Sequence, residues 1–189
     1  MKRVLYAVPV VALFAAVASS QPPAAGQKVG LATSLQRGYA GVKLNLTQEA
    51  EKMSEADYSF KPGSTADART FAQVIAHVAQ SQFGQCSNWK GVPNPMQGKN
   101  LEQELKTKAE VTKALADSFA LCDDLFAQTT DENATQFVKL GPNEVTRAAA
   151  LYGLIAHGNE LYGTGAVYLR SKNIVPPSTE RAMGRGRGN

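Results

Sequence analysis

Residues 154–163 read LIAHGNELYG, an apolar stretch with helical spacing that holds one of the chain's two histidines. The apolar pattern continues on both sides and stops at residues 173–177, NIVPP, because proline cannot continue a helix. We therefore expect a helix from about Asn143, a suitable N-cap, to Lys172. Glycine costs about 1 kcal/mol relative to alanine inside a helix, so the four here indicate close packing, bending or room for a ligand. They are Gly153, Gly158, Gly163 and Gly165.

Three earlier segments repeat apolar residues every three or four positions, which is typical of amphipathic helices. The first covers residues 31–53, the second runs from Asp67 or Arg69 to Asn88, and the third spans residues 101–126. No alternation typical of a strand reaches a comparable length. The sequence thus predicts an all-α fold, a four-helix bundle.

The connections suggest how these helices are arranged. The connection formed by residues 89–100 is longer than neighbouring antiparallel helices need, since connections in helix bundles usually take about 2–8 residues. Twelve extended residues reach roughly 40 Å, whereas a helix of 20 residues is roughly 30 Å long. We therefore expect a long crossover that leaves the second and third helices parallel. Residues 129–142 form the last, polar connection.

The first 20 residues have the pattern of a secretory signal peptide. Lys2 and Arg3 precede an apolar run from Val4 to Ala18, and small residues come before Gln21. That run is short for a membrane span, which needs roughly 20 residues. The alternative is an uncleaved anchor. We expect cleavage, a flexible lead-in over residues 21–30, and a periplasmic or secreted protein with no stable membrane span.

The charge distribution argues against nucleic-acid binding. Cleavage would lower the formal charge from +4 to +2, and the tail from Glu180 to Asn189 accounts for that remainder. A nearly neutral body lacks the concentrated basic face that binds phosphates. Residues 179–189, which end in GRGRGN, are expected to form a disordered basic tail. No sequence feature indicates the oligomeric state, so a homodimer is compatible with the sequence.

Cys86 and Cys122 are the only cysteines. Export would place them in an oxidising compartment, and each lies near the end of its predicted helix. Those ends meet if the two helices run parallel, which favours a disulfide. The alternative is two buried, unpaired thiols.

The two histidines, His77 and His157, lie in amphipathic helices. Gln73, Gln80 and Ser81 form a polar strip beside His77, as expected of a helix that lines a wet pocket. A half-exposed helix has the same pattern. From the residues alone, hydrogen bonding within a polar pocket of the bundle is a better explanation of the histidines than ligation.

Two parts of the chain resemble DinB-like proteins. Residues 156–163, together with YLR at 168–170 and IVPPS at 174–178, are similar to the family's last helix and ending. FKP at 60–62, RTF at 69–71 and IAHVA at 75–79 are similar to its second helix. The resemblance covers residues 31–178 and implies a bundle with up-down-down-up topology.

The resemblance also implies a divalent-metal site of three histidines, one from the second helix and an H-x-x-x-H pair from the fourth. His77 and His157 match, while Leu161 replaces the third ligand. Glu160, three residues after His157, is a candidate to help, although a solvated carboxylate is the simpler reading. We expect Glu160 and Tyr162 to flank His157, and a zinc- or nickel-type ion to bind an incomplete site.

Members with intact sites look like thiol-dependent transferases, isomerases or hydrolases. The leading hypothesis is an exported DinB-like protein with a divalent-metal or small-ligand pocket between its second and fourth helices, a degenerate enzyme. The rival is a non-catalytic binding or stress-related scaffold that has lost the metal site. Catalytic residues and the small-molecule ligand cannot be named from the sequence.

Overall fold

The computed structural model describes residues 26–186, so the predicted signal peptide and the first half of the lead-in lie outside the described residues. The helices are α1 (Leu31–Lys52), α2 (Phe71–Lys90), α3 (Leu101–Glu104), α4 (Lys108–Ala127), α5 (Arg147–Ser171) and α6 (Pro177–Gly186). Two 3-10 turns, η1 (Glu55–Asp57) and η2 (Asn133–Thr135), and the strands β1 (Phe137–Leu140) and β2 (Asn143–Thr146) complete the fold. No helix among the described residues is long and apolar enough to cross a membrane.

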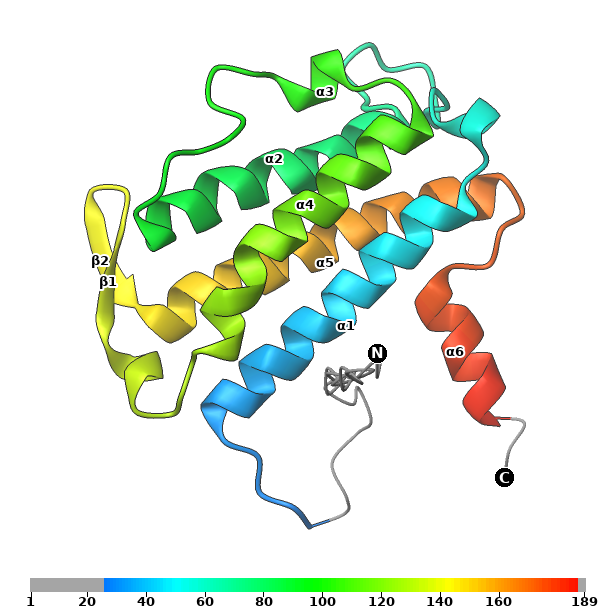
Figure 1. Cartoon of the computed structure of the whole chain (residues 1–189). Helices are drawn as coiled ribbons and strands as arrows, with labels where there is room; N and C mark the ends of the chain where they lie inside the picture. The colour runs from blue at the N-terminus through cyan, green and yellow to red at the C-terminus, as the bar shows by residue number, and fades with distance from the viewer. Residues whose placement is uncertain (1–25, 187–189) are drawn as a thin grey trace, which may run out of the picture.

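Four long helices form the bundle, with α1 against α4 and α5, and α2 against α4 and α5 (Figure 1). In Figure 1, α1 and α5 run in one direction and α2 and α4 in the other. This is the predicted up-down-down-up topology. The crossover between α2 and α4 passes along the outside of the bundle and contains the short helix α3.

Capping residues mark where the helices start more accurately than the apolar periodicity does. Thr70 and Gln73 form a capping box that starts α2, and Thr107 and Glu110 form one that starts α4. The predicted third helix is therefore two helices. Leu105, which ends α3, has extended backbone angles, because the Thr107 box fixes a new start at Lys108.

The prediction that the last long helix starts at Asn143 is wrong. Asn143 belongs to β2, which pairs antiparallel with β1. Gly141, at φ +60°, begins a two-residue turn that glycine adopts without strain. Thr146 ends the hairpin and accepts a hydrogen bond from the Ala149 amide, so α5 begins at Arg147.

The structure also has a helix, α6, where the sequence analysis expects a disordered tail. Its residues make specific contacts with α1 and α5. Glu180 pairs with Lys52 at 3.0 Å, and the Arg181 guanidinium donates to the side chains of Asn45 and Gln48. The Tyr162 hydroxyl donates to Ser178 Oγ at 2.7 Å.

One charged residue lies inside the core. Glu49 of α1 is 0% exposed, and neither carboxyl oxygen has a hydrogen-bond partner among the described residues. Burial alone raises the pKa of Glu49 to about 9. A Cβ added at Gly165 of α5 would lie 2.5 Å from Glu49 Oε2, so that glycine makes room for the carboxyl.

The four glycines of α5 fall into two kinds. A Cβ at Gly158 would lie 2.5 Å from Val42 Cγ1, and Gly165 is equally close to Glu49. Nothing lies within 4 Å of a Cβ added at Gly153 or Gly163. Close helix packing therefore explains two of the four.

Gly158→Ala should lower the free energy of unfolding by about 1–3 kcal/mol, because Val42 is buried and too stiff to move aside. Gly153→Ala should raise it by up to about 1 kcal/mol, since alanine is the better helix former. Urea unfolding of both variants measures the contrast. Equal effects at the two positions would contradict this account of the α1–α5 contact.

A disulfide joins Cys86 of α2 to Cys122 of α4, with the two Cα atoms 5.4 Å apart. Both residues lie near the C-terminal ends of their helices, which is where parallel helices bring them together. The predicted bridge and the predicted parallel pair thus agree with the structure.

Reduction of this bridge should lower the free energy of unfolding by roughly 3–4 kcal/mol, because the oxidised unfolded chain is restricted by a loop of 36 residues. Urea unfolding with and without reductant measures the effect. The variant Cys86→Ala/Cys122→Ala should resemble reduced wild type and ignore the reductant. An unchanged wild-type midpoint would show that no bridge forms.

Candidate functional site

The structure brings the two histidines together between α2 and α5. His77 Nε2 and His157 Nε2 are 3.3 Å apart, and the ring centroids are 5.2 Å apart. Both side chains are half-buried. Residues 80 positions apart in the chain thus present the same nitrogen of each ring to one point.

Glu102 of α3 holds the other side of the His77 ring. His77 Nδ1 lies 2.6 Å from Glu102 Oε1, and Arg69 Nε donates to Glu102 Oε2 at 2.7 Å. Burial acts to raise the pKa of Glu102, but hydrogen bonds from Arg69 and His77 outweigh it, so the pKa lies below its ordinary value. The carboxylate is therefore ionised and accepts the proton on His77 Nδ1.

This arrangement determines which nitrogens are free. With Nδ1 of His77 donating to Glu102, the neutral ring carries a lone pair on Nε2. Burial, and then the nearby His77 and Arg69, lower the pKa of His157, against an opposing effect of Glu160. His157 is thus kept neutral, and it either donates from Nε2 to His77 or offers a second lone pair.

The distance between the two nitrogens fits a shared metal. Zinc binds imidazole nitrogen at about 2.0–2.1 Å in tetrahedral geometry, which places two such nitrogens about 3.3–3.4 Å apart. The observed separation is 3.3 Å. A carboxylate on the far nitrogen is also the usual partner of a metal-bound histidine, because it fixes the tautomer and the ring orientation.

A cavity of about 340 Å³ opens beside the pair, and we call it the histidine cavity. Its lining includes His77, His157, Glu160 and Leu161. Leu161 is 5% exposed and lies where the third histidine was expected, whereas Glu160 is exposed. No group of three or more His, Cys, Asp or Glu side chains within residues 26–186 could hold a metal ion.

Tyr162, expected beside His157, is absent from the lining of the histidine cavity. Its hydroxyl hydrogen bonds with Ser178, so it fastens α6 to the bundle. The reason is helical geometry: Tyr162 is buried towards α6, while Leu161, one position earlier, faces α2.

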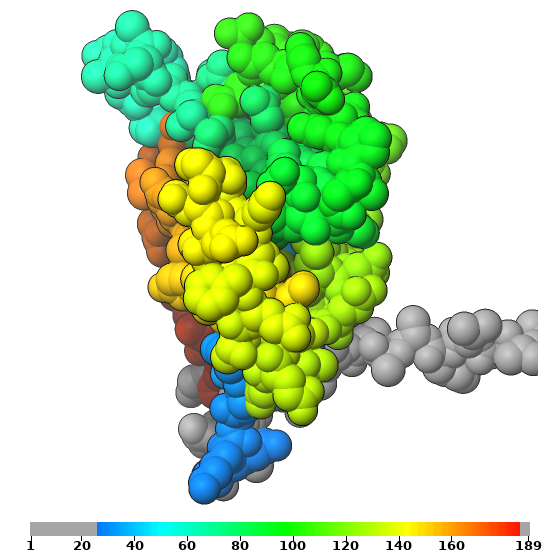
Figure 2. All heavy atoms as spheres, turned by 90° about the vertical axis from the view of Figure 1, so that its left-hand side faces the viewer, coloured from blue at the N-terminus to red at the C-terminus, as the bar shows by residue number. Residues whose placement is uncertain are grey.

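A longer open groove, about 560 Å³, lies on the other side of His77; we call it the α2 groove. It contains Gln80 and Ser81 and reaches Leu140 and Gly141 at the hairpin turn. Figure 2 looks onto this end of the molecule, where the yellow hairpin borders the green surface of α2 and the crossover. Two residues of the predicted polar strip, Gln80 and Ser81, thus line a cavity, whereas Gln73 belongs to the capping box of α2. Gln80 Oε1 also accepts a hydrogen bond from the Leu101 amide at 2.8 Å.

Sequence reasoning missed Glu102, the residue that orients His77. It lies 25 positions away, on the short helix α3 within the crossover. Its only signal was its place two positions after Asn100, which caps α3, a short helix that packs against α2. Arg69 belongs to a motif that resembles the family, but no sequence pattern predicted its pairing with Glu102.

Comparisons with known proteins identify the family and support the helical fold. Residues 44–162 match the family model described as the DinB superfamily. A DinB-like protein from Bacillus cereus has 13% identity and a TM-score of 0.61, with 76% of this chain and 93% of that chain covered. A conserved protein from Enterococcus faecalis has 14% identity and a TM-score of 0.59, covering 76% and 97%.

A DinB-like protein from Bacillus subtilis is 21% identical, with a TM-score of 0.54 and coverage of 74% of this chain and 92% of that chain. At such identities these structures support the fold alone. A search of curated proteins gave no significant match. The family match spans well over half of the chain and includes both histidines. The chain therefore belongs to the DinB superfamily.

Proposed function

We propose that this DinB-superfamily protein binds one divalent transition metal, of the zinc or nickel type, through Nε2 of His77 and His157. The observation that carries the proposal is their 3.3 Å separation, with the carboxylate of Glu102 on the far side of His77. Solvent or a small ligand in the histidine cavity would complete the coordination, and Glu160 is the nearest carboxylate on α5.

A bound metal would act as a Lewis acid towards water or a thiol. The chain's own residues supply the rest of the site. Glu102 and Arg69 fix the His77 ring, while Leu161 and Val74 provide an apolar wall that excludes water from part of the cavity. A degenerate transferase or hydrolase is the activity that such a site supports best.

Isothermal titration of tag-free protein with zinc or nickel should show weak, one-to-one binding, because two imidazoles leave the metal short of the usual three protein ligands. His77→Ala and His157→Ala should each abolish it, and acidification should release the metal as protons compete for the imidazoles. These are the chain's only histidines, so no other site of this type competes. Unchanged binding in either variant would overturn the proposal.

The second candidate is a binding scaffold that keeps the fold without a metal. Buried, apolar Leu161 in the ligand position favours it. In that case the histidines form a hydrogen bond across α2 and α5. His157→Ala would then lower stability without any metal effect.

We also propose that the protein is exported to the periplasm or secreted. The Cys86–Cys122 bridge supports this, since disulfides persist in oxidising compartments and are rare in the cytosol. Mass spectrometry of protein from an exporting host should give an N-terminus near Gln21. Recovery of the full-length chain in membranes would contradict it.

A further inference from the structure

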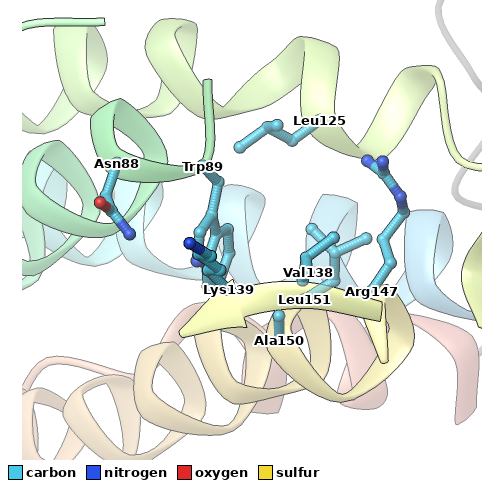
Figure 3. A pocket seen from close by; sticks show the side chains of 8 residues that line it. All are labelled: Asn88, Trp89, Leu125, Val138, Lys139, Arg147, Ala150 and Leu151. Carbon is cyan, nitrogen blue, oxygen red and sulfur yellow. The ribbon is translucent and has the colours of Figure 1, made fainter. Parts of the chain in front are cut away.

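A third cavity lies at the N-terminal end of α5, and we call it the Trp89 pocket (Figure 3). It measures about 340 Å³, within the range of small-molecule sites. The ends of α2 and α4, strand β1 and the start of α5 enclose it. The residues that line it are Asn88, Trp89, Leu125, Val138, Lys139, Arg147, Ala150 and Leu151.

Two buried donors of this pocket lack partners. Trp89 Nε1 and Arg147 Nε are shielded from solvent, and neither has a hydrogen-bond acceptor among the described residues. Buried donors are nearly always paired, because an unmade hydrogen bond forfeits the solvation that the donor had in water. Both therefore favour an acceptor brought by a ligand.

The charge of the pocket is positive. Arg147 and Lys139 contribute cations, and no Asp or Glu is present among the described lining residues. Glu144 lies opposite Lys139 in the hairpin register, yet no ion pair joins them, and Arg147 has none within the described part of the chain. The start of the 25-residue helix α5 adds its positive end.

The remaining lining is apolar. In Figure 3, Val138 and Leu151 lie between Trp89 on one side and Arg147 on the other, with Ala150 below and Leu125 above. An apolar body can pack against these side chains and the indole ring, while the guanidinium receives a carboxylate through its paired donors. A bare inorganic anion would leave the apolar wall unused.

We propose that the Trp89 pocket binds a small monocarboxylate with an apolar body, such as a medium-chain fatty acid. The carboxylate pairs with Arg147, and the chain lies against Val138, Leu151 and Trp89. Lys139, which lies beside Trp89 in Figure 3, adds a longer-range attraction for the anion. The site is separate from the histidine cavity, with which it shares no lining residue. Through Asn88 and Trp89 it adjoins the α2 groove, which ends at His77.

Trp89 is the chain's only tryptophan, so its fluorescence reports directly on this pocket. The probes are octanoate, the neutral analogue octanamide, and inorganic phosphate, each titrated by fluorescence and by calorimetry. Octanoate should bind saturably and at least tenfold more tightly than octanamide, and phosphate should not bind. Equal affinities for the two octanoyl compounds, or no saturable octanoate binding, would overturn the proposal.

Arg147→Met should weaken octanoate binding at least tenfold and leave octanamide unchanged, and Lys139→Met on the exposed strand should weaken it less. Arg185→Met, which removes an exposed cation from α6, is the matched control and should bind as wild type. Circular dichroism checks that each variant folds. If Arg147→Met does not fold, octanoate binding by Lys139→Met tests the proposal in its place. His77→Ala should bind octanoate normally, so failure of the metal proposal leaves this one intact. Octanoate binding that neither cation variant weakens would refute it.

Discussion

Leu161→His should raise the affinity for zinc or nickel at least a hundredfold over wild type. Position 161 is one helical turn after His157 and lines the same cavity as both histidines, so a new imidazole there would face the shared point of the two Nε2 atoms. A structural zinc site contributes about 10–16 kcal/mol through four ligands. One ligand is thus worth roughly 3 kcal/mol, and each factor of ten in affinity needs about 1.4 kcal/mol.

Calorimetric titration of tag-free variants measures the effect. Val167→His places an imidazole on the exposed side of the same helix and should bind as wild type does. His157→Ala in the Leu161→His background should remove the gain. Because Leu161 is buried, the variant's fold must first be checked by circular dichroism. A folded Leu161→His protein without improved binding would show that the residue is not aimed at the histidines.

The bundle was predictable because its information is local and periodic. Apolar spacing predicted the long helices, and the length of one connection, residues 89–100, predicted their relative directions. The Cys86–Cys122 disulfide could then be predicted, because parallel helices bring residues near their corresponding ends together. Such arguments require only the chain's reach and the helical repeat.

The hairpin and α6 escaped prediction for a different reason. Four-residue strands are too short for alternation to stand out, and the Gly141-Pro142 turn looked like an ordinary loop. Helix α6 is polar and rich in glycine, and its position depends on contacts with distant residues of α1. The stability of α6 depends on tertiary packing, which the helix propensity of its own residues does not predict.

The candidate site was predictable only in part. The resemblance selected His77 and His157, and the structure brings them together. Glu102 was missed because its pairing with His77 depends on how the crossover folds back onto α2. The Trp89 pocket was missed because it includes Val138 and Lys139 of the unpredicted hairpin.

Glu49→Gln should stabilise the protein at neutral and alkaline pH and leave its stability at pH 4 unchanged. The pKa of Glu49 is about 9 in the folded protein, against an ordinary value of 4.5. Between these values the folded state keeps a proton that the unfolded state releases. The free energy of unfolding therefore falls as pH rises, by about 1.4 kcal/mol per pH unit for this group.

Below pH 4.5 both states are protonated, so the carboxyl carries no pH-dependent penalty there. At pH 7 the accumulated penalty is roughly 3–4 kcal/mol, and it continues to grow until about pH 9. Glutamine has nearly the same shape and stays neutral throughout, so it removes this penalty while leaving the packing against Gly165 intact. The free energy of unfolding of a typical domain is about 5–15 kcal/mol, so the Glu49 penalty is a large fraction of it.

Urea unfolding of wild type and Glu49→Gln at pH 4, 7 and 9 measures the difference. Glu51→Gln is the matched control, since Glu51 lies on the same helix but is exposed, and its variant should follow wild type at each pH. A Glu49→Gln protein with the wild-type pH dependence would show that the carboxyl is ionised in the folded state. Water or a cation would then have to reach it between α1 and α5, and the core around Gly165 would be open rather than dry.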